Sequence, residues 1–131
     1  MMNCTLYADT CECDALALRI GFADKGHQHY FIIQRAEDFR EEIFPDMRNI
    51  YIELDDQGWA GYGGIHCIIL QHQRLTILLT PDMSAQMGGY EAITIMFNRD
   101  ETSCEDLKDV LTCIFKGYER HFFDEAPGNS T

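Results

Sequence analysis

The chain has 131 residues, of which 46% are apolar and 24% are charged, values that fit one globular domain with an ordinary core and exclude wholesale disorder. Its formal net charge of −12 repels nucleic-acid phosphates and would speed encounter with a basic protein. No apolar run approaches the ~20 residues that cross a bilayer and no export signal begins the chain, so we expect a cytoplasmic protein without membrane or nucleic-acid partners.

Extended runs dominate the first half of the chain. Residues 5–8 favour a short strand, and four apolar residues alternate along residues 16–22. A turn-like segment joins this run to residues 30–35, which are rich in aromatic and β-branched side chains, so the two runs predict a hairpin. The spacing of apolar residues over 37–44 favours one or two helical turns before Pro45, and residues 49–54 return to a strand.

The second half begins with a glycine-rich loop and continues with further strands. Three runs read as strands, at residues 65–70, 74–80 and 91–97. The polar residues 71–73 suit a hairpin connection between the first two of these strands. Pro81 near the start and Gly88 beyond the end predict a short helix over residues 81–87.

The clearest helix lies near the C-terminus. Thr102 and Glu105 have the spacing of a capping box, and apolar residues recur every three or four positions from Leu107 to Tyr118. These elements predict an α+β domain over residues 1–125 and a flexible tail over residues 126–131. We expect a mostly antiparallel sheet of about six to seven strands, with the C-terminal helix packed on one face and one or two short helices. Exposed sheet edges would permit a homodimer, although no pattern specifies one.

Six cysteines would allow three disulfides, but the apolar composition makes such bonds unnecessary. Cys67 lies inside a strand-like run and Cys113 beside the apolar face of the helix, where reduced cysteines behave as small apolar residues. We therefore expect most of the six to be free thiols.

One set of residues has metal-like chemistry: Cys11 and Cys13, with His27 and His29. Thiolates and imidazoles in this number could hold zinc tetrahedrally. A single residue separates each pair, however, whereas structural zinc pairs usually lie two to four residues apart. We expect no metal and no other cofactor, and retain a small metal-binding or thiol-based regulatory domain as the alternative function.

No set of nucleophile, base and orienting residue is visible, so we expect no enzymatic activity. His66 and Cys67 are adjacent, but neighbours on a strand point to opposite faces. The carboxylate pairs at 41–42 and 55–56 are typical of solvated surface.

The glycine-rich loop around Trp59 and Tyr62 is the most unusual stretch of the chain. It precedes a strand and follows two carboxylates, so it does not suit phosphate binding. Tryptophan and tyrosine dominate interface hot spots, which favours an aromatic contact surface. The alternative is a turn in which glycines adopt positive φ and the aromatic rings cap the sheet. The candidate partner contacts are Asp55, Asp56, Trp59 and Tyr62.

This loop also carries a family resemblance. The motif reads Asp56-Gln57-Gly58-x-x-x-Tyr62-Gly63-Gly64-Ile65. Upstream of it lies Ile33-Gln34-Arg35-Ala36. Downstream follow Arg74-Leu75-x-Ile77, a short helix ending at Gly88, and a helix ending Ile114-Phe115. Over roughly residues 16–115 the chain resembles the Immunity protein 10 family.

The resemblance implies a bacterial cytoplasmic α+β protein, encoded beside a polymorphic toxin, that binds its cognate toxin and blocks it. It supplies no catalytic or cofactor residues, and the cysteine and histidine pairs lie outside its pattern. Acidic residues gather over 37–56 and again from residue 100 onward. Either block would suit a basic toxin such as a nuclease, and either would also suit ordinary solvated surface.

Overall fold

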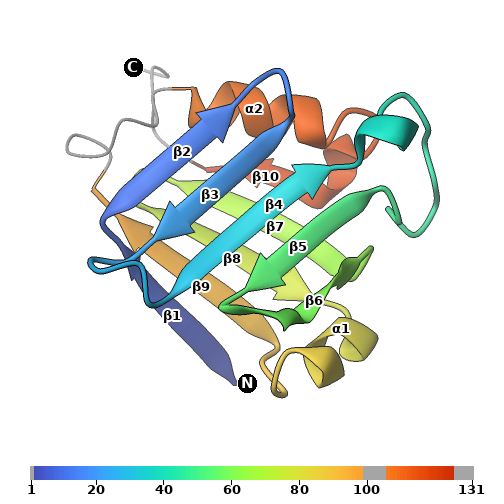
Figure 1. The fold of residues 1–131 in the computed structure, drawn as a ribbon. Helices are drawn as coiled ribbons and strands as arrows, with labels where there is room; N and C mark the ends of the chain where they lie inside the picture. Colours follow the sequence, from blue (N-terminus) through green and yellow to red (C-terminus); the bar gives the residue numbers. More distant parts are fainter. Residues whose placement is uncertain (1, 99–105, 126–131) are drawn as a thin grey trace.

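The computed structural model describes residues 2–98 and 106–125, which form two stacked five-stranded sheets (Figure 1). The first sheet contains β2 (Thr10–Asp14), β3 (Arg19–Ala23), β4 (Tyr30–Arg35), β5 (Ile50–Leu54) and β6 (Asp56–Tyr62). These strands are neighbours in sequence order, and every pair is antiparallel. The predicted hairpin of residues 16–35 is confirmed as β3 and β4, with the first strand starting at Arg19.

The second sheet has two parallel edges around an antiparallel centre. Its order is β1 (Asn3–Ala8), β9 (Ala92–Phe97), β8 (Arg74–Leu79), β7 (Ile65–Gln71) and β10 (Phe122–Asp124). The three central strands are antiparallel, whereas β1 runs parallel to β9 and β10 parallel to β7. The edge pairings therefore bring the two ends of the chain onto one sheet.

The predicted α+β class and the predominance of antiparallel pairing are confirmed, but the single sheet of six to seven strands is wrong. The described residues contain ten strands in two sheets. Residues 56–62 form the edge strand β6, whereas the sequence predicted a loop there. The chain then leaves the first sheet at Gly63 and Gly64, both at positive φ. Because glycine is depleted in strands, the glycine-rich sequence did not indicate the strand that precedes this corner.

The core fills the space between the sheets because strand alternation buries one face of each. The residues with no exposed surface include Ile20, Phe31, Ile33, Ile50 and Ile52 of the first sheet, and Ile68, Leu75, Ile77, Ile93 and Ile95 of the second. Phe22 and Phe97 meet across the gap with ring centroids 5.6 Å apart. In Figure 1, none of the described helices lies over the outer face of the first sheet.

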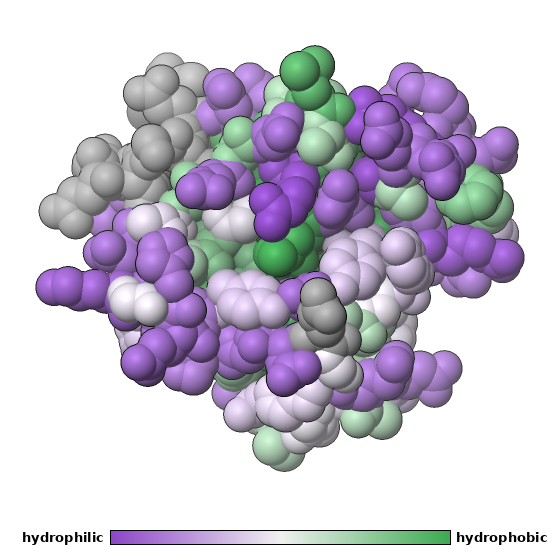
Figure 2. All heavy atoms as spheres, in the orientation of Figure 1, coloured by the Kyte–Doolittle hydropathy of each residue, from purple (hydrophilic) through white to green (hydrophobic). Residues whose placement is uncertain are grey.

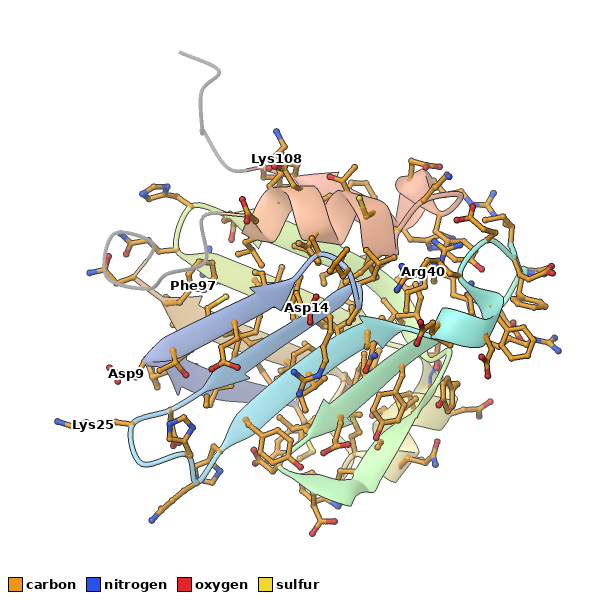
Figure 3. All side chains as sticks on the ribbon, turned by 45° about the horizontal axis from the view of Figure 1, so that its top comes forward. Asp9, Asp14, Lys25, Arg40, Phe97 and Lys108 are labelled. Carbon is orange, nitrogen blue, oxygen red and sulfur yellow. The ribbon has the colours of Figure 1, made fainter. Side chains whose placement is uncertain are left out.

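Helices close the ends of this sandwich. α2 (Leu107–Ile114) buries four apolar residues in the core and contacts β2 and β3. Lys108, which points outward from α2 (Figure 3), pairs with Asp124 of β10 at 3.0 Å. The capping box at Thr102 and Glu105 and the predicted tail over 126–131 lie outside the described residues.

The predicted helix over 81–87 is confirmed as α1 (Pro81–Gln86). Thr80 caps it by accepting from the Met83 amide, as its position before Pro81 favours. Shorter 3-10 turns occur at η1 (Glu37–Phe39) and η2 (Glu119–His121). η1 replaces the helical turns predicted over 37–44, and Arg40 beside it donates to the Leu16 carbonyl at 2.6 Å.

A buried arginine joins the η1 loop to the end of α2. Arg35 is 1% exposed, although it lies in a strand whose other inward residues are apolar. Its guanidinium donates to the carbonyl oxygens of Ile114 (2.9 Å), Lys116 (2.7 Å) and Glu42 (3.0 Å) and lies 5.2 Å from the centre of the Tyr118 ring. A cation therefore satisfies carbonyls that the helix end leaves without amide partners.

The same network fixes the loop that follows β4. The Asn49 side-chain amide donates to the carbonyl oxygens of Phe39 (3.0 Å) and Glu42 (2.7 Å). The Tyr118 hydroxyl donates to Asn49 and accepts from the Phe44 amide, both at 2.7 Å. These bonds hold Phe39 and Phe44 beside the outer face of the first sheet.

Candidate partner-binding surface

Three tyrosines surround a glutamate on the outer face of the first sheet. Because inward residues of β4 and β5 alternate with outward ones, Tyr30, Tyr51 and Glu53 point away from the core. Tyr62 of β6 is paired with Tyr51, and their ring centroids are 5.1 Å apart. We call Tyr30, Tyr51, Glu53 and Tyr62 the tyrosine–glutamate face. Figure 2 looks onto this side of the molecule, where small apolar areas lie among polar residues.

Glu53 is held by its neighbours and nearly removed from water. It is 8% exposed, and its carboxylate accepts a hydrogen bond from the hydroxyl of Tyr51 (2.5 Å) and another from that of Tyr30. No ion pair between the described residues involves Glu53. Both of its hydrogen-bond partners are neutral, so the face presents a fixed and uncompensated negative charge.

The two phenols provide a pH test of this arrangement. Donation to Glu53 raises the pKa of Tyr30 and of Tyr51 to about 12, from an ordinary value of 10.0. We expect Glu53→Gln to lower both pKa values toward 10, because the charged acceptor is gone. In the wild type the contribution of these groups to stability is complete below pH 10 and is lost as the pH rises through about 12. Ultraviolet titration of phenolate formation measures both effects.

The control for this titration is Tyr7→Phe, which removes an exposed phenol on β1. It should leave the two late transitions of Tyr30 and Tyr51 unchanged. Early ionisation of every tyrosine in the wild type would contradict the hydrogen bonds to Glu53, as would late ionisation that persists in Glu53→Gln.

A groove of about 810 Å³ adjoins this face at Tyr51 and Tyr62. Its remaining walls come from Gln34, Ala36, Glu37, Asp38, Phe39, Phe44 and Arg48. Phe39 is 52% exposed and meets Phe44 edge to face. Arg48 covers the Phe44 ring and is paired with Asp46 at 3.0 Å. Apolar rings therefore lie beside exposed carboxylates, a combination that suits protein recognition.

The two aspartates predicted as partner contacts brace the turn between β5 and β6. Asp55, at φ 63°, accepts from the Tyr30 amide (2.9 Å) and from the His29 ring (3.1 Å). The bond to Asp55 raises the pKa of His29 above 6.5. Asp56 accepts from the Gly58 amide at 2.7 Å. Both carboxylates thus have roles within the turn, and Asp56 is also exposed.

Trp59 and Tyr62 lie on opposite faces of β6, as their separation by three residues requires in a strand. The Trp59 ring packs against Tyr90 with centroids 6.1 Å apart, and a Cβ on Gly88 would come within 2.9 Å of it. Tyr62 is 62% exposed on the outer face. The structure therefore places Tyr62 beside Tyr51, and Trp59 between β6 and the α1–β9 connection.

Sequence reasoning missed Tyr30, Tyr51 and Glu53 as surface candidates. Their alternation with buried residues marked each as outward facing. Bringing them together required the register in which Ile33 pairs with Ile52 and Tyr51 with Tyr62, which the sequence does not show.

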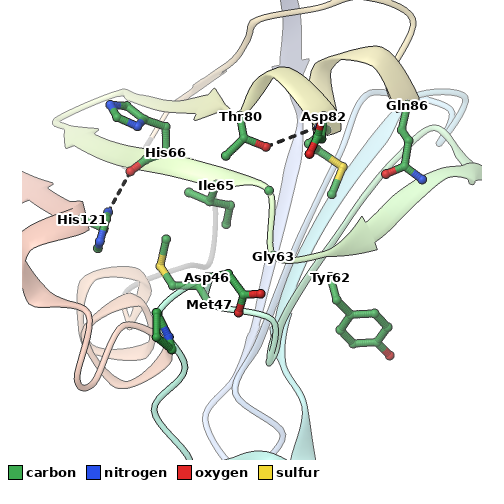
Figure 4. Close-up of a pocket in the computed structure, with 13 residues that line it drawn as sticks. Asp46, Met47, Tyr62, Gly63, Ile65, His66, Thr80, Asp82, Gln86 and His121 are labelled. Carbon is green, nitrogen blue, oxygen red and sulfur yellow. Dashed lines mark hydrogen bonds between the residues drawn. The ribbon is translucent and has the colours of Figure 1, made fainter.

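A second hollow, of about 440 Å³, lies at the Gly63-Gly64 corner (Figure 4). His121 donates to the His66 carbonyl oxygen at 2.9 Å on one wall, and Thr80 and Asp82 of the α1 region form another. Cys67, next to His66, is 8% exposed, and burial raises the pKa of its thiol. A protonated, buried sulfur beside an outward histidine does not form a nucleophile–base pair.

The metal-like set does not assemble. Across residues 2–98 and 106–125, no three His, Cys, Asp or Glu side chains are grouped to hold a metal ion. Cys11 is buried in β2 and Cys13 is partly buried against the core, whereas His27 and His29 are exposed in the β3–β4 turn.

The expectation of thiols needs a correction at Cys11 and Cys13. Both are disulfide-bonded in the structure, whereas Cys4, Cys67 and Cys113 are free. Both point inward from β2, because residues two apart on a strand share a face. Cys104 lies outside the described residues.

Comparison with known proteins gives one match. The family model described as Immunity protein 10 matches residues 4–105, which run from β1 to beyond β9. No curated protein and no solved structure matches the chain. Among the described residues, no helix combines the length and apolar character that a membrane span requires.

Proposed function

Because the chain belongs to the Immunity protein 10 family, we propose that it neutralises a cognate toxin by binding to it. The family match carries this proposal, since it spans 102 residues (4–105) and includes most of both sheets. Immunity proteins as a class act by binding and not by catalysis. The protein would then act in the cytoplasm of the cell that makes the toxin.

Charge and surface chemistry support a basic partner. The net charge of −12 would attract a cationic surface, such as the nucleic-acid cleft of a nuclease. A contact of about 800 Å² on each protein would suffice for tight binding. Among the contacts expected from sequence, Tyr62 is the most accessible large side chain. Asp55, Asp56 and Trp59 remain proposed contacts at the same end of the first sheet.

Co-expression with the toxin encoded beside this gene tests the proposal. We expect the protein to restore growth and to elute with the toxin as one complex on gel filtration. Unchanged killing, together with separate elution of the two proteins, would refute neutralisation by binding.

A titration of purified toxin distinguishes binding from a catalytic mode of protection. Tight binding predicts that toxin activity falls linearly and ends at a fixed molar ratio near one to one. Inactivation by a small fraction of an equivalent would instead reveal an enzyme that modifies or degrades the toxin.

A further inference from the structure

Glu53 is the only buried carboxylate among the described residues. It is 8% exposed, carries no described ion pair, and accepts hydrogen bonds only from two neutral phenols. A carboxylate moved out of water costs free energy that two neutral donors offset only in part. A solvated glutamate at this position would avoid that cost. Because a bound cation would offset it, the arrangement suits a cation-binding site.

The surroundings leave room above this carboxylate. One row of outward residues crosses the sheet through Glu12, Gly21, Ile32, Glu53 and Ala60, as the strand registers show. Two members of the row are a glycine and an alanine, and a Cβ on Gly21 would meet no atom within 4 Å. A long side chain from another protein can therefore lie along this row.

Aromatic rings flank the same position. Tyr30 and Tyr51 reach Glu53 from its two sides, and Tyr62 lies against Tyr51. Ring faces attract cations, and the attraction grows when water is excluded. Arg19, the cation on the neighbouring outward row, stands two strands from Tyr51, a separation of about 10 Å. Among the described residues, no ion pair joins a cation to Glu53 and no cation–π contact involves Tyr30, Tyr51 or Tyr62.

We propose that this tyrosine–glutamate face is the toxin-binding centre, and that it receives an arginine or lysine side chain of the toxin over Glu53. The inference rests on the proposed function, because it names the surface and the partner chemistry of that binding. The incoming cation pairs with the Glu53 carboxylate while its stem lies against the tyrosine rings. The outer face of the second sheet has exposed Tyr7 and Phe123, but none of its described charged residues is nearly buried, so it lacks this complementarity.

Matched substitutions test the centre against the toxin. Glu53→Gln and Tyr62→Ala should each weaken toxin binding by about 30-fold or more, the loss expected at a hot spot. The controls are Glu91→Gln, just before β9, and Tyr7→Ala, on β1, which change the same residue types at exposed positions. Each should change the affinity for the toxin by less than about 3-fold. Glu53→Gln should remain folded at neutral pH, because the glutamine side-chain oxygen still accepts a phenol hydrogen bond, and urea unfolding checks that a loss of binding is not a loss of fold. Wild-type binding that survives Glu53→Gln would overturn the proposal.

A toxin-free probe separates this inference from the proposed function. N-acetyl-arginine amide should shift the ring resonances of Tyr30, Tyr51 and Tyr62 in nuclear magnetic resonance titrations. N-acetyl-citrulline amide, which has the same shape without the charge, should not, and neither compound should act on Glu53→Gln. If the toxin fails to bind but arginine shifts these rings, the proposed function is wrong and the cation site stands. Equal shifts of the tyrosine resonances with both compounds, or no shift with either, would refute the cation site.

Discussion

Replacing Arg35 by methionine should lower the free energy of unfolding by about 3–5 kcal/mol. Methionine fills a similar volume but donates no hydrogen bond. The carbonyl oxygens of Ile114, Lys116 and Glu42 would then be left without the guanidinium that each now contacts. Urea unfolding followed by circular dichroism measures the change. A fall in the midpoint without a change in slope would locate the loss in the native state.

Arg74→Met is the matched control for this prediction. Arg74 is exposed and donates to the Gln71 side chain, so its loss should change stability by no more than about 0.5 kcal/mol. A loss below about 1 kcal/mol in Arg35→Met would show that water replaces the guanidinium at the three carbonyls. It would refute the role assigned to Arg35 in holding η1 against α2.

Gly64→Ala should destabilise the protein by about 2–4 kcal/mol. The residue has φ +82°, which an alanine adopts only at a cost of about 1–2 kcal/mol. A Cβ there would also come within 2.5 Å of the Met83 methyl carbon and within 2.7 Å of its Cβ, so α1 must move away from the β6–β7 corner. Thermal or urea unfolding measures the loss.

Two variants check that explanation. Gly21→Ala adds a Cβ in open space, where φ is not positive, and should change stability by no more than about 0.5 kcal/mol. Combining Gly64→Ala with Met83→Ala should cost less than the sum of the two single changes, because the clash with the Met83 methyl carbon is removed while the close approach to its Cβ stays. Simple additivity would show that the outer part of the Met83 side chain contributes nothing to the effect of Gly64→Ala.

Local pattern predicted the elements of the central sheets well. Alternation of apolar residues identified β3, β4, β5 and the three central strands of the second sheet, since one face of each strand is buried. It could not assign strands to sheets, because the sandwich depends on pairings between residues far apart in sequence. The predicted strand at residues 5–8 lies in β1, but β2, β6 and β10 were missed: glycines disguise β6, and β10 has only three residues.

The sequence by itself determined the acidic balance, the α+β class, α1 and the loop motif that led to the family. Each of these depends on composition or on neighbours within a few residues. Three facts came only from the tertiary structure. Arg35 is buried under α2, and Trp59 and Tyr62 lie on opposite faces of β6. Glu53 lies among tyrosines. These facts depend on strand register, because a shift of one residue would move every side chain of a strand to the other face.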